Sequence, residues 1–314
     1  MNILFAKSNN HRKNEFRIDT VIIKNGSQTI VKKYIKDQLA QNHLEKYVDN
    51  IKAIKKKTRG IVFPKILTQS HSFLEIEYMD FPSLELLIEQ SLIEKKFIEA
   101  NNYISALQDI LDNIDSISVC PYDNKEFRLN FDPQNKYRSW KKEDCCKLGI
   151  LDIDFDNVLM DNHDKPILID SEWVLNIPIP KKFILFRALF YLCNQLQSII
   201  ATYCSEDFPC YEVLLYFLMP VKWFDALKLS QNEVRKYMYF ESEFQNKIKL
   251  INHGFDPERI LKKKAIIKKR YSLSLEYYLN QNQEEEKVTI GPKLLYVIEK
   301  YYKLKGFLMG KKYD

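Results

Sequence analysis

The stretch LDIDFDNVLMDNHDKPILIDSEWV (151–174) decides the interpretation of the whole chain. Two short apolar runs around the polar turn DNHDK predict a β-hairpin, and side chains that carry oxygen atoms stand on both sides of it. Asp152 lies five residues before Asn157, and Asp170 comes thirteen residues later, at the end of the second run. The order is therefore a loop with the pattern D-x-x-x-x-N, then a hairpin, then an aspartate.

This spacing suits phosphoryl transfer from ATP, a reaction that depends mainly on positioning and charge. It requires a carboxylate that orients the attacking hydroxyl, and oxygen ligands for magnesium, which prefers hard oxygen atoms. Asp152 is the candidate catalytic base, Asn157 a candidate metal ligand and Asp170 the principal magnesium ligand. Acidic clusters also serve as solvated turns or helix caps. The apolar run that leads into Asp170 favours the nucleotide site.

The first 80 residues predict a strand-rich lobe with one helix. Runs of β-branched and apolar residues predict strands, and an apolar period of three to four residues predicts a helix. We expect strands at 3–6, 16–23, 29–35, 61–67 and 72–79 and a helix at 37–54. The dipeptide Asn25-Gly26 predicts a type I′ hairpin turn between the second and third strands, because both residues tolerate positive φ.

Helical periods dominate after Pro82, with helices expected at 84–88 and 97–117. The apolar stretch from Phe183 predicts a buried core helix rather than a membrane span, because an arginine and several amides interrupt it. The sequence thus predicts an α+β chain without internal repeats. We divide it into a strand-rich nucleotide lobe at 1–80, a helical catalytic lobe at 81–255 and a helical extension at 256–314.

This order of elements, together with the 151–174 motif, resembles the protein-kinase-like superfamily, and within it the small-molecule branch typified by aminoglycoside and choline phosphotransferases. The resemblance implies a two-lobed fold that uses ATP and magnesium. Lys33, in the strand TIVKKY, matches the lysine that holds the ATP phosphates. Glu45 on the following helix is the implied partner of that lysine. Glu77, Tyr78 and Met79 fall where the hinge between the lobes would hold the adenine.

The chain departs from the superfamily pattern in several places. Ile150 stands where the HRD histidine would be, the loop SNNHRKNE (8–15) has no glycine, and neither D-F-G nor A-P-E occurs. The short segment 174–180 leaves no room for an activation segment, which favours a small acceptor over a protein. Two hypotheses therefore stay open, an active kinase and a pseudokinase that acts as a nucleotide-binding or scaffold module.

A narrower resemblance concerns kinase-like domains encoded with bacterial surface-polysaccharide (O-antigen and lipopolysaccharide) genes. It rests on the strings SNNHRKNEFRIDTVI, VKKYIKDQLAQNHL, IDSEWV followed by IPIPKKFILFR, and YFESEFQ, and it spans about residues 1–250. The resemblance implies phosphorylation of a sugar hydroxyl on a small-molecule or glycan acceptor.

Composition excludes several kinds of site. Only 7 of the 314 residues are glycine, and none of their spacings makes GxGxxG or GxxxxGK[ST], which argues against a Rossmann dinucleotide site and a P-loop. The formal net charge of +6 does not predict a nucleic-acid partner. The 6 cysteines lack CxxC pairs, and the first apolar run is too short for a signal peptide, so we expect reduced thiols in a cytoplasmic protein.

The C-terminal region carries the basic clusters 262–264 and 268–270, a polar linker at 280–287 and a last helix from Pro292. The clusters suit the solvated face of a helix, or contact with anionic lipid head groups at the inner membrane face. The last helix suits docking on the large lobe, on the membrane or on another copy of the chain.

One geometric expectation tests the two-lobed interpretation. Lys33 and Asp170 come from different lobes, and we expect their side-chain ends within about 6 Å, the range over which opposite charges shift each other's protonation. The roles of four further residues stay open. Glu172 suits a further metal ligand or a structural acid, and Trp173 a packing aromatic. His11 and Arg12 suit phosphate contacts or a polar surface loop.

Overall fold

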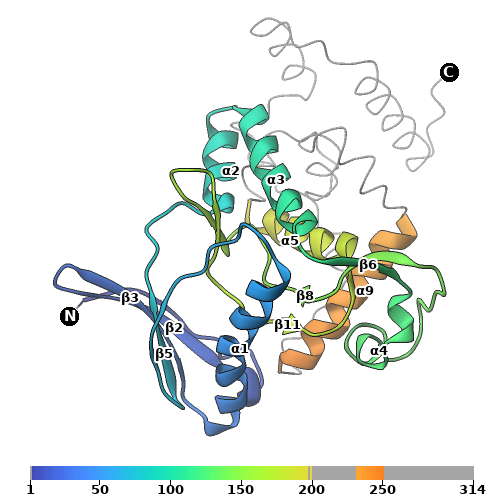
Figure 1. The fold of residues 1–314 in the computed structure, drawn as a ribbon, viewed down its shortest axis with the longest axis horizontal. Coiled ribbons are helices and arrows are strands. Elements are labelled where there is room, and N and C mark those ends of the chain that lie inside the picture. The colour runs from blue at the N-terminus through green and yellow to red at the C-terminus, as the bar shows by residue number, and fades with distance from the viewer. Residues whose placement is uncertain (1, 197–198, 200–230, 251–314) are drawn as a thin grey trace, which may run out of the picture.

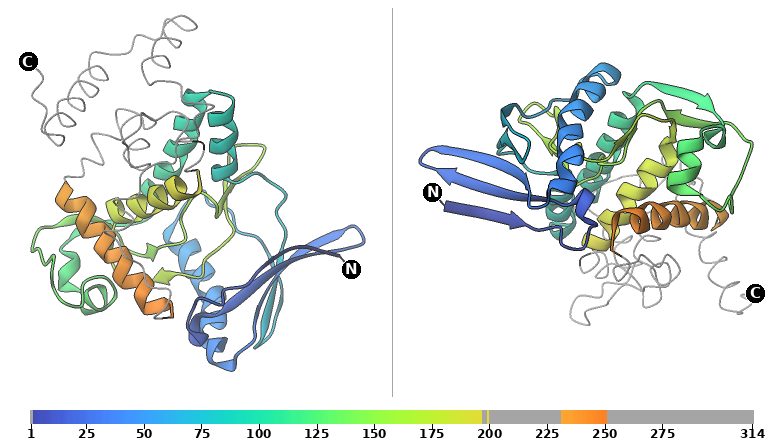
Figure 2. Two further views of the ribbon diagram at one scale, coloured as in Figure 1. Left: turned by 180° about the vertical axis from the view of Figure 1, so that it is seen from behind. Right: turned by 90° about the horizontal axis from the view of Figure 1, so that it is seen from below.

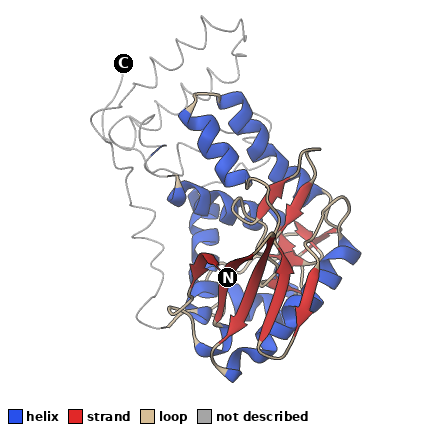
Figure 3. Ribbon diagram, turned by 90° about the vertical axis from the view of Figure 1, so that its left-hand side faces the viewer, coloured by secondary structure: helices blue, strands red, loops and turns tan. Residues whose placement is uncertain are grey.

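The computed structural model describes residues 2–196, 199 and 231–250, which form an α+β structure with a sheet lobe and a mostly helical lobe (Figure 1). The sheet lobe holds a five-stranded antiparallel sheet in the order β1-β2-β3-β5-β4 (Figure 3). Its elements are β1 (Asn2–Lys7), β2 (Ile18–Asn25), β3 (Gln28–Ile35), α1 (Gln41–Lys57), β4 (Ile66–Gln69) and β5 (Phe73–Glu77). The expected strand-rich lobe with one α-helix is confirmed.

The hairpin between β2 and β3 turns one residue later than predicted. Asn25 pairs with Gln28, so Gly26 and Ser27 are the central residues of the turn. Gly26 has a φ of +61°, as the first central position of a type II′ turn requires. The predicted Asn25-Gly26 type I′ turn is therefore wrong, because the ladder extends to Asn25 itself.

The segment before β4 also differs from the predicted strand at 61–67. The strand begins at Ile66, because Pro64 has no N–H to donate to a ladder. Val62 instead forms a parallel bridge with Ile167, donating to Pro166 O (2.9 Å) and accepting from Leu168 N (3.0 Å). This bridge joins the sheet lobe to the hairpin that precedes Asp170.

The second lobe contains helices and short strands. The helices are α2 (Leu84–Ile93), α3 (Phe97–Asp112), α4 (Lys125–Phe131), α5 (Lys181–Gln195) and α9 (Gln231–Ile248). The strands are β6 (Ser116–Val119), β7 (Glu143–Cys146), β8 (Gly149–Ile150), β9 (Val158–Met160), β10 (Pro166–Leu168), β11 (Val174–Leu175) and β12 (Ile179–Pro180). The predicted hairpin is confirmed as β9 and β10, which pair antiparallel. The predicted helix 97–117 ends earlier, at Asp112, and β6 follows it.

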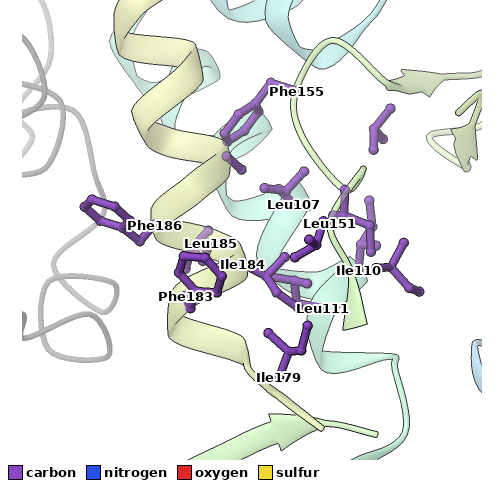
Figure 4. Close-up of a cluster of buried hydrophobic side chains, with 14 of the residues drawn as sticks. Leu107, Ile110, Leu111, Leu151, Phe155, Ile179, Phe183, Ile184, Leu185 and Phe186 are labelled. Atoms are coloured by element: carbon purple, nitrogen blue, oxygen red, sulfur yellow. The ribbon is translucent and has the colours of Figure 1, made fainter. Parts of the chain in front are cut away.

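Apolar packing fixes the segment around Asp152 to these helices. Leu151 and Phe155 are buried, and Figure 4 places them in a cluster with Leu107 of α3 and Ile184 of α5. Figure 2 shows α9 beside α4 and across α5. Aromatic contacts hold it there, among them the rings of Phe183 and Phe240 at 5.7 Å.

Two sequence-based expectations concern membranes and the C-terminal region. None of the helices in the described part of the chain has the length and apolar character of a membrane span. The extension at 256–314, with its basic clusters, its linker and the helix from Pro292, lies outside the described residues.

Candidate active site

The centre of the site is an ion pair between the two lobes. Lys33 Nζ, near the end of β3, donates to Asp170 Oδ2 at 2.8 Å, which confirms the expected proximity. The lysine side chain is 7% exposed and the aspartate 23%. Burial alone would lower the pKa of Lys33, but the charges of Asp170 and Glu172 outweigh it and raise that pKa. The ammonium is therefore held in its charged form.

Strand alternation places the neighbouring lysine on the other face of the sheet, as predicted. Lys32 pairs with Glu75 at 3.4 Å, and its Nζ lies 4.0 Å from the centre of the Phe73 ring. Lys33 instead lies over the ring of Tyr47, at 5.2 Å. Only Lys33 of the two faces the 169–173 segment.

Asp152 is buried and lies beside the 169–173 segment. Its Oδ2 accepts the backbone N–H of Trp173. Burial, with the charges of Asp170 and Glu172, raises the pKa of Asp152 to about 7. A carboxylate with a pKa near neutrality suits a general base, since it can take up and release a proton close to the working pH.

Asn157 is placed beside Asp170 by the backbone. The N–H of Ile169, the residue before Asp170, donates to Asn157 O at 3.0 Å. Asn157 Nδ2 donates to the backbone oxygen of Asp152 at 3.3 Å, so its carboxamide oxygen is the atom suited to a cation. Asp170 remains partly exposed.

This donor set fits magnesium. One carboxylate and one carboxamide are hard oxygen donors, and magnesium usually combines one or two such side chains with water and substrate phosphates. Within the described ranges, no group of three or more His, Cys, Asp or Glu side chains has the arrangement of a metal site. The remaining ligands would thus have to come from solvent and from the nucleotide.

The structure contradicts the expected pairing of Glu45 with Lys33. Glu45 accepts from Gln41 at 2.8 Å and contacts His71 at 3.0 Å, and its side chain is 39% exposed. The physical reason is helical phase. His43 and Tyr47 lie on the buried face of α1, and Glu45 is two residues, more than half a turn, from each.

Other side chains of α1 contact the 169–172 segment. Tyr47 donates to Ile169 O at 3.0 Å, and Asn50 donates to Ser171 O at 2.7 Å. His43 Nε2 lies 2.9 Å from Glu172 Oε1. Our sequence reasoning missed these residues, although the spacing of 43, 47 and 50 marks one face of a helix.

Glu172 connects the two lobes. Its Oε1 accepts from Arg12 Nη1 as well as contacting His43. Burial alone would raise the pKa of Glu172, but Arg12, His43 and Lys33 together lower it to about 2. Trp173 packs against His43 with ring centres 4.6 Å apart, which agrees with its expected packing role.

The loop 8–15 is fixed to the end of α9. Lys13 N donates to Ile248 O and Leu250 N to His11 O, each at 2.9 Å. Arg12 points to Glu172, and its guanidinium also lies 5.5 Å from the centre of the Trp173 ring. Arg12 therefore links the two lobes, which neither of its expected roles, a phosphate contact or a place in a polar surface loop, had predicted.

The expected hinge follows β5. Glu77 is the last residue of that strand, and Tyr78 and Met79 lead from it toward α2. The Glu77 N–H already donates to Lys65 O at 2.9 Å. A role for these three residues in holding adenine remains a prediction.

A buried arginine, which our sequence reasoning also missed, supports the loop that carries Asp152. Arg187 of α5 donates from Nη1 to Leu151 O, one residue before Asp152, and from Nε to Glu241 Oε2 of α9 at 3.0 Å. Asp154 Oδ2 lies 3.9 Å from Nη1. An arginine inside an apolar helix pattern was the signal in the sequence.

Comparisons with known proteins give structural neighbours only. No protein-family profile and no curated protein matches the chain. The streptomycin–ATP–APH(2")-IIa ternary complex is 12% identical with a TM-score of 0.31, over 74% of this chain and 93% of that one. Macrolide 2'-phosphotransferase type I is 9% identical with a TM-score of 0.36, over 77% and 84%. Scores this low carry no argument about function, which has to be argued from the site residues.

Proposed function

We propose that this protein is a magnesium-dependent phosphotransferase that uses ATP and acts on a hydroxyl group of a small molecule. The observation that carries the proposal is the ion pair between Lys33 and Asp170, which brings two lobes together beside Asp152 and Asn157. A cation for phosphates, oxygen ligands for a metal and a buried base are the components that phosphoryl transfer requires.

Each residue has a defined role in the proposal. Lys33 would bind phosphate oxygens, and Asp170 and Asn157 would hold magnesium. When bound, the metal supplies positive charge that offsets the charge of the phosphates. The acceptor oxygen attacks the γ-phosphorus, the bond from phosphorus to the β–γ bridging oxygen breaks, and ADP leaves with that electron pair. Asp152 takes the proton of the acceptor hydroxyl, for which a pKa of about 7 is suited.

The acceptor and the cellular setting rest on the sequence resemblance alone. It favours a carbohydrate or glycan hydroxyl and a place in surface-polysaccharide biosynthesis. The functional division into a nucleotide lobe at 1–80 and a catalytic lobe at 81–255, a cytoplasmic location and contact of the basic extension with the inner membrane face belong to the same proposal.

A pseudokinase is the second candidate function, favoured by two observations. Ile150 replaces the superfamily histidine, and the loop 8–15 contains no glycine. A pseudokinase would bind nucleotide, or a partner, without sustained turnover. Release or transfer of phosphate in the presence of sugars and lipid-linked glycans separates the two candidates.

Calorimetric titration of the purified full chain with ATP, with and without magnesium, tests the proposal. We expect magnesium-dependent binding in the wild type, loss of it in Asp170→Ala, and retained binding without turnover in Asp152→Asn. Asp49→Asn is the matched control, because Asp49 is 74% exposed and pairs only with Lys52 among the described ion pairs. Absence of magnesium-dependent ATP binding in the wild type would refute the proposal.

A further inference from the structure

The loop between α4 and β7 exposes an aromatic ring beside basic side chains. Trp140 is 64% exposed, and the Arg138 guanidinium lies 4.2 Å from the centre of its ring. Lys141 and Lys142 follow directly and are also exposed. A single exposed apolar side chain is common on a protein, but this tryptophan stands among three cations. We call these four residues the Trp140 surface.

The acids that follow the Trp140 surface are engaged with other cations. Glu143 pairs with Lys236 at 3.0 Å, and Asp144 lies 3.4 Å from Lys181. The three cations of the surface form no ion pair within the described part of the chain. The surface therefore presents a net positive charge to the solvent.

Hydrogen bonds fix the loop that carries the surface. Asp132, at the start of the loop, is fully buried. It accepts from the backbone N–H groups of Lys136 at 2.7 Å and Tyr137 at 2.8 Å. The Cys120 thiol donates to Ser139 O at 3.2 Å, directly before the exposed ring. The loop is therefore ordered, and docking through it requires little further loss of conformational freedom.

The Trp140 surface lies away from the candidate active site. Figure 1 shows α4 and β6 on the side of the large lobe opposite the sheet of β2, β3 and β5. The loop joins α4 to β7, the strand that pairs with β6. This position separates the surface from Lys33 and Asp170.

We propose that the Trp140 surface docks the protein on a membrane that contains anionic lipids. A tryptophan ring suits the boundary between acyl chains and head groups, because it is apolar and carries one polar N–H. Basic side chains beside it attract the anionic head groups. Apolar insertion and this attraction add up in binding to a membrane surface. The surface is separate from the extension at 256–314, and the inference does not depend on the proposed phosphotransferase activity.

The surroundings of the ring favour a lipid surface over a single-stranded nucleic acid. Proteins that bind single strands offer successive aromatic rings on which bases stack. Here Arg138 lies over the Trp140 ring. The other aromatic residue of the loop, Tyr137, packs against Tyr239 of α9 with ring centres 5.4 Å apart. The loop thus offers one aromatic ring for insertion and no row of rings for stacking.

Sedimentation of the full chain with lipid vesicles tests the proposal. The wild type should bind vesicles of phosphatidylglycerol and phosphatidylcholine more tightly than vesicles of phosphatidylcholine alone. Trp140→Ala should weaken this binding about tenfold. A lysine near an anionic surface contributes about fivefold, so Lys141→Gln with Lys142→Gln should weaken binding about 25-fold. This second loss should become smaller at high salt, because salt screens exposed charges.

Two variants elsewhere on the protein provide matched controls. Lys56→Gln with Lys57→Gln removes an equal charge from two neighbouring exposed lysines at the end of α1. Ile93→Ala shortens an apolar side chain of α2 that is 61% exposed. Both should bind vesicles as the wild type does. All of these variants change exposed side chains, so their circular dichroism spectra and melting temperatures should match those of the wild type.

Four results overturn the inference. The first is a wild type that does not prefer anionic vesicles. The second is unchanged binding by the two Trp140-surface variants, which would assign the membrane contact to another part of the chain. The third is an equal loss in the control variants, which would mean that net charge alone drives binding. The fourth is self-association, or binding of a single-stranded oligonucleotide, that requires Trp140 while vesicles are not bound.

Discussion

The ion pair between Arg187 and Glu241 supports a quantitative prediction about the loop that precedes Asp152. Glu241 is fully buried, and the Arg187 side chain is 8% exposed. Arg187→Met removes the cation while leaving the carboxylate in the core. It also leaves the backbone oxygen of Leu151 without the donor that Arg187 Nη1 supplies.

The expected loss of stability follows from the hydrogen bonds that Glu241 keeps in Arg187→Met. Glu241 Oε1 keeps the hydrogen bonds from Tyr191 at 2.6 Å and Gln245 at 2.8 Å, whereas Oε2 loses the one that Arg187 Nε donates. Removing one member of a buried pair costs about 3–5 kcal/mol, because the other charge is left uncompensated. We expect the free energy of unfolding of Arg187→Met to fall by about that amount, measured by urea unfolding followed by fluorescence and circular dichroism.

The double variant Arg187→Met with Glu241→Leu is the critical control. Replacing a buried ion pair with apolar side chains is often close to neutral, so the double variant should be more stable than Arg187→Met alone. A loss below about 1 kcal/mol in Arg187→Met, or a double variant no more stable than it, would refute the reasoning. The first result would mean that water reaches Glu241. The second would mean that packing of the aliphatic part of the Arg187 side chain contributes more to stability than its charge.

Two further predictions concern the same lobe. Gly149→Ala would place a Cβ 2.2 Å from Ile179 Cδ1 and 2.6 Å from Cγ1. We therefore expect the free energy of unfolding to fall by about 1–3 kcal/mol. Adding Ile179→Ala to Gly149→Ala should relieve part of the clash. The pKa of Glu85 is raised from 4.5 to about 7 by burial and by the charges of Asp156 and Glu89. The folded state therefore binds the proton more tightly, and stability falls as the pH rises from about 4.5 through 7. Glu85→Gln should remove part of that fall, seen as a melting-temperature advantage over the wild type at pH 8 that is absent at pH 4; equal advantages at both would contradict it.

Local patterns were enough to predict elements that have either a long apolar period or a clear polar turn. The buried face of α1 repeats at helical spacing, and β9 and β10 flank a polar turn, so both were found. Strands of two residues, such as β8 and β11, carry too little pattern to be recognised. The predicted strand at 61–67 failed because one proline outweighs several β-branched neighbours.

The site residues also divide into those that a local pattern predicts and those that it cannot predict. Asp152, Asn157 and Asp170 lie within one short stretch, so their spacing alone predicted that they meet. Glu172 is separated from Arg12 by 160 residues, and no local pattern connects them. Glu45 was assigned by analogy of position, but two residues along a helix is enough to turn a side chain away from its expected partner.

The glycine-free loop gives a final prediction about how nucleotide would bind. Glycine-rich loops cradle phosphates with free backbone N–H groups, but here several of these groups are already used. The N–H of Asn9 donates to Asp19 at 3.0 Å and that of Lys13 to Ile248 at 2.9 Å, and directly after the loop the N–H of Phe16 donates to Lys13 at 2.9 Å. The phosphates would therefore be held by side chains such as Lys33 and by the metal. Backbone N–H exchange of Lys13 and Phe16 should be slow in the free protein and unchanged when ATP and magnesium are added. Marked slowing on addition would mean that the loop rearranges over the phosphates.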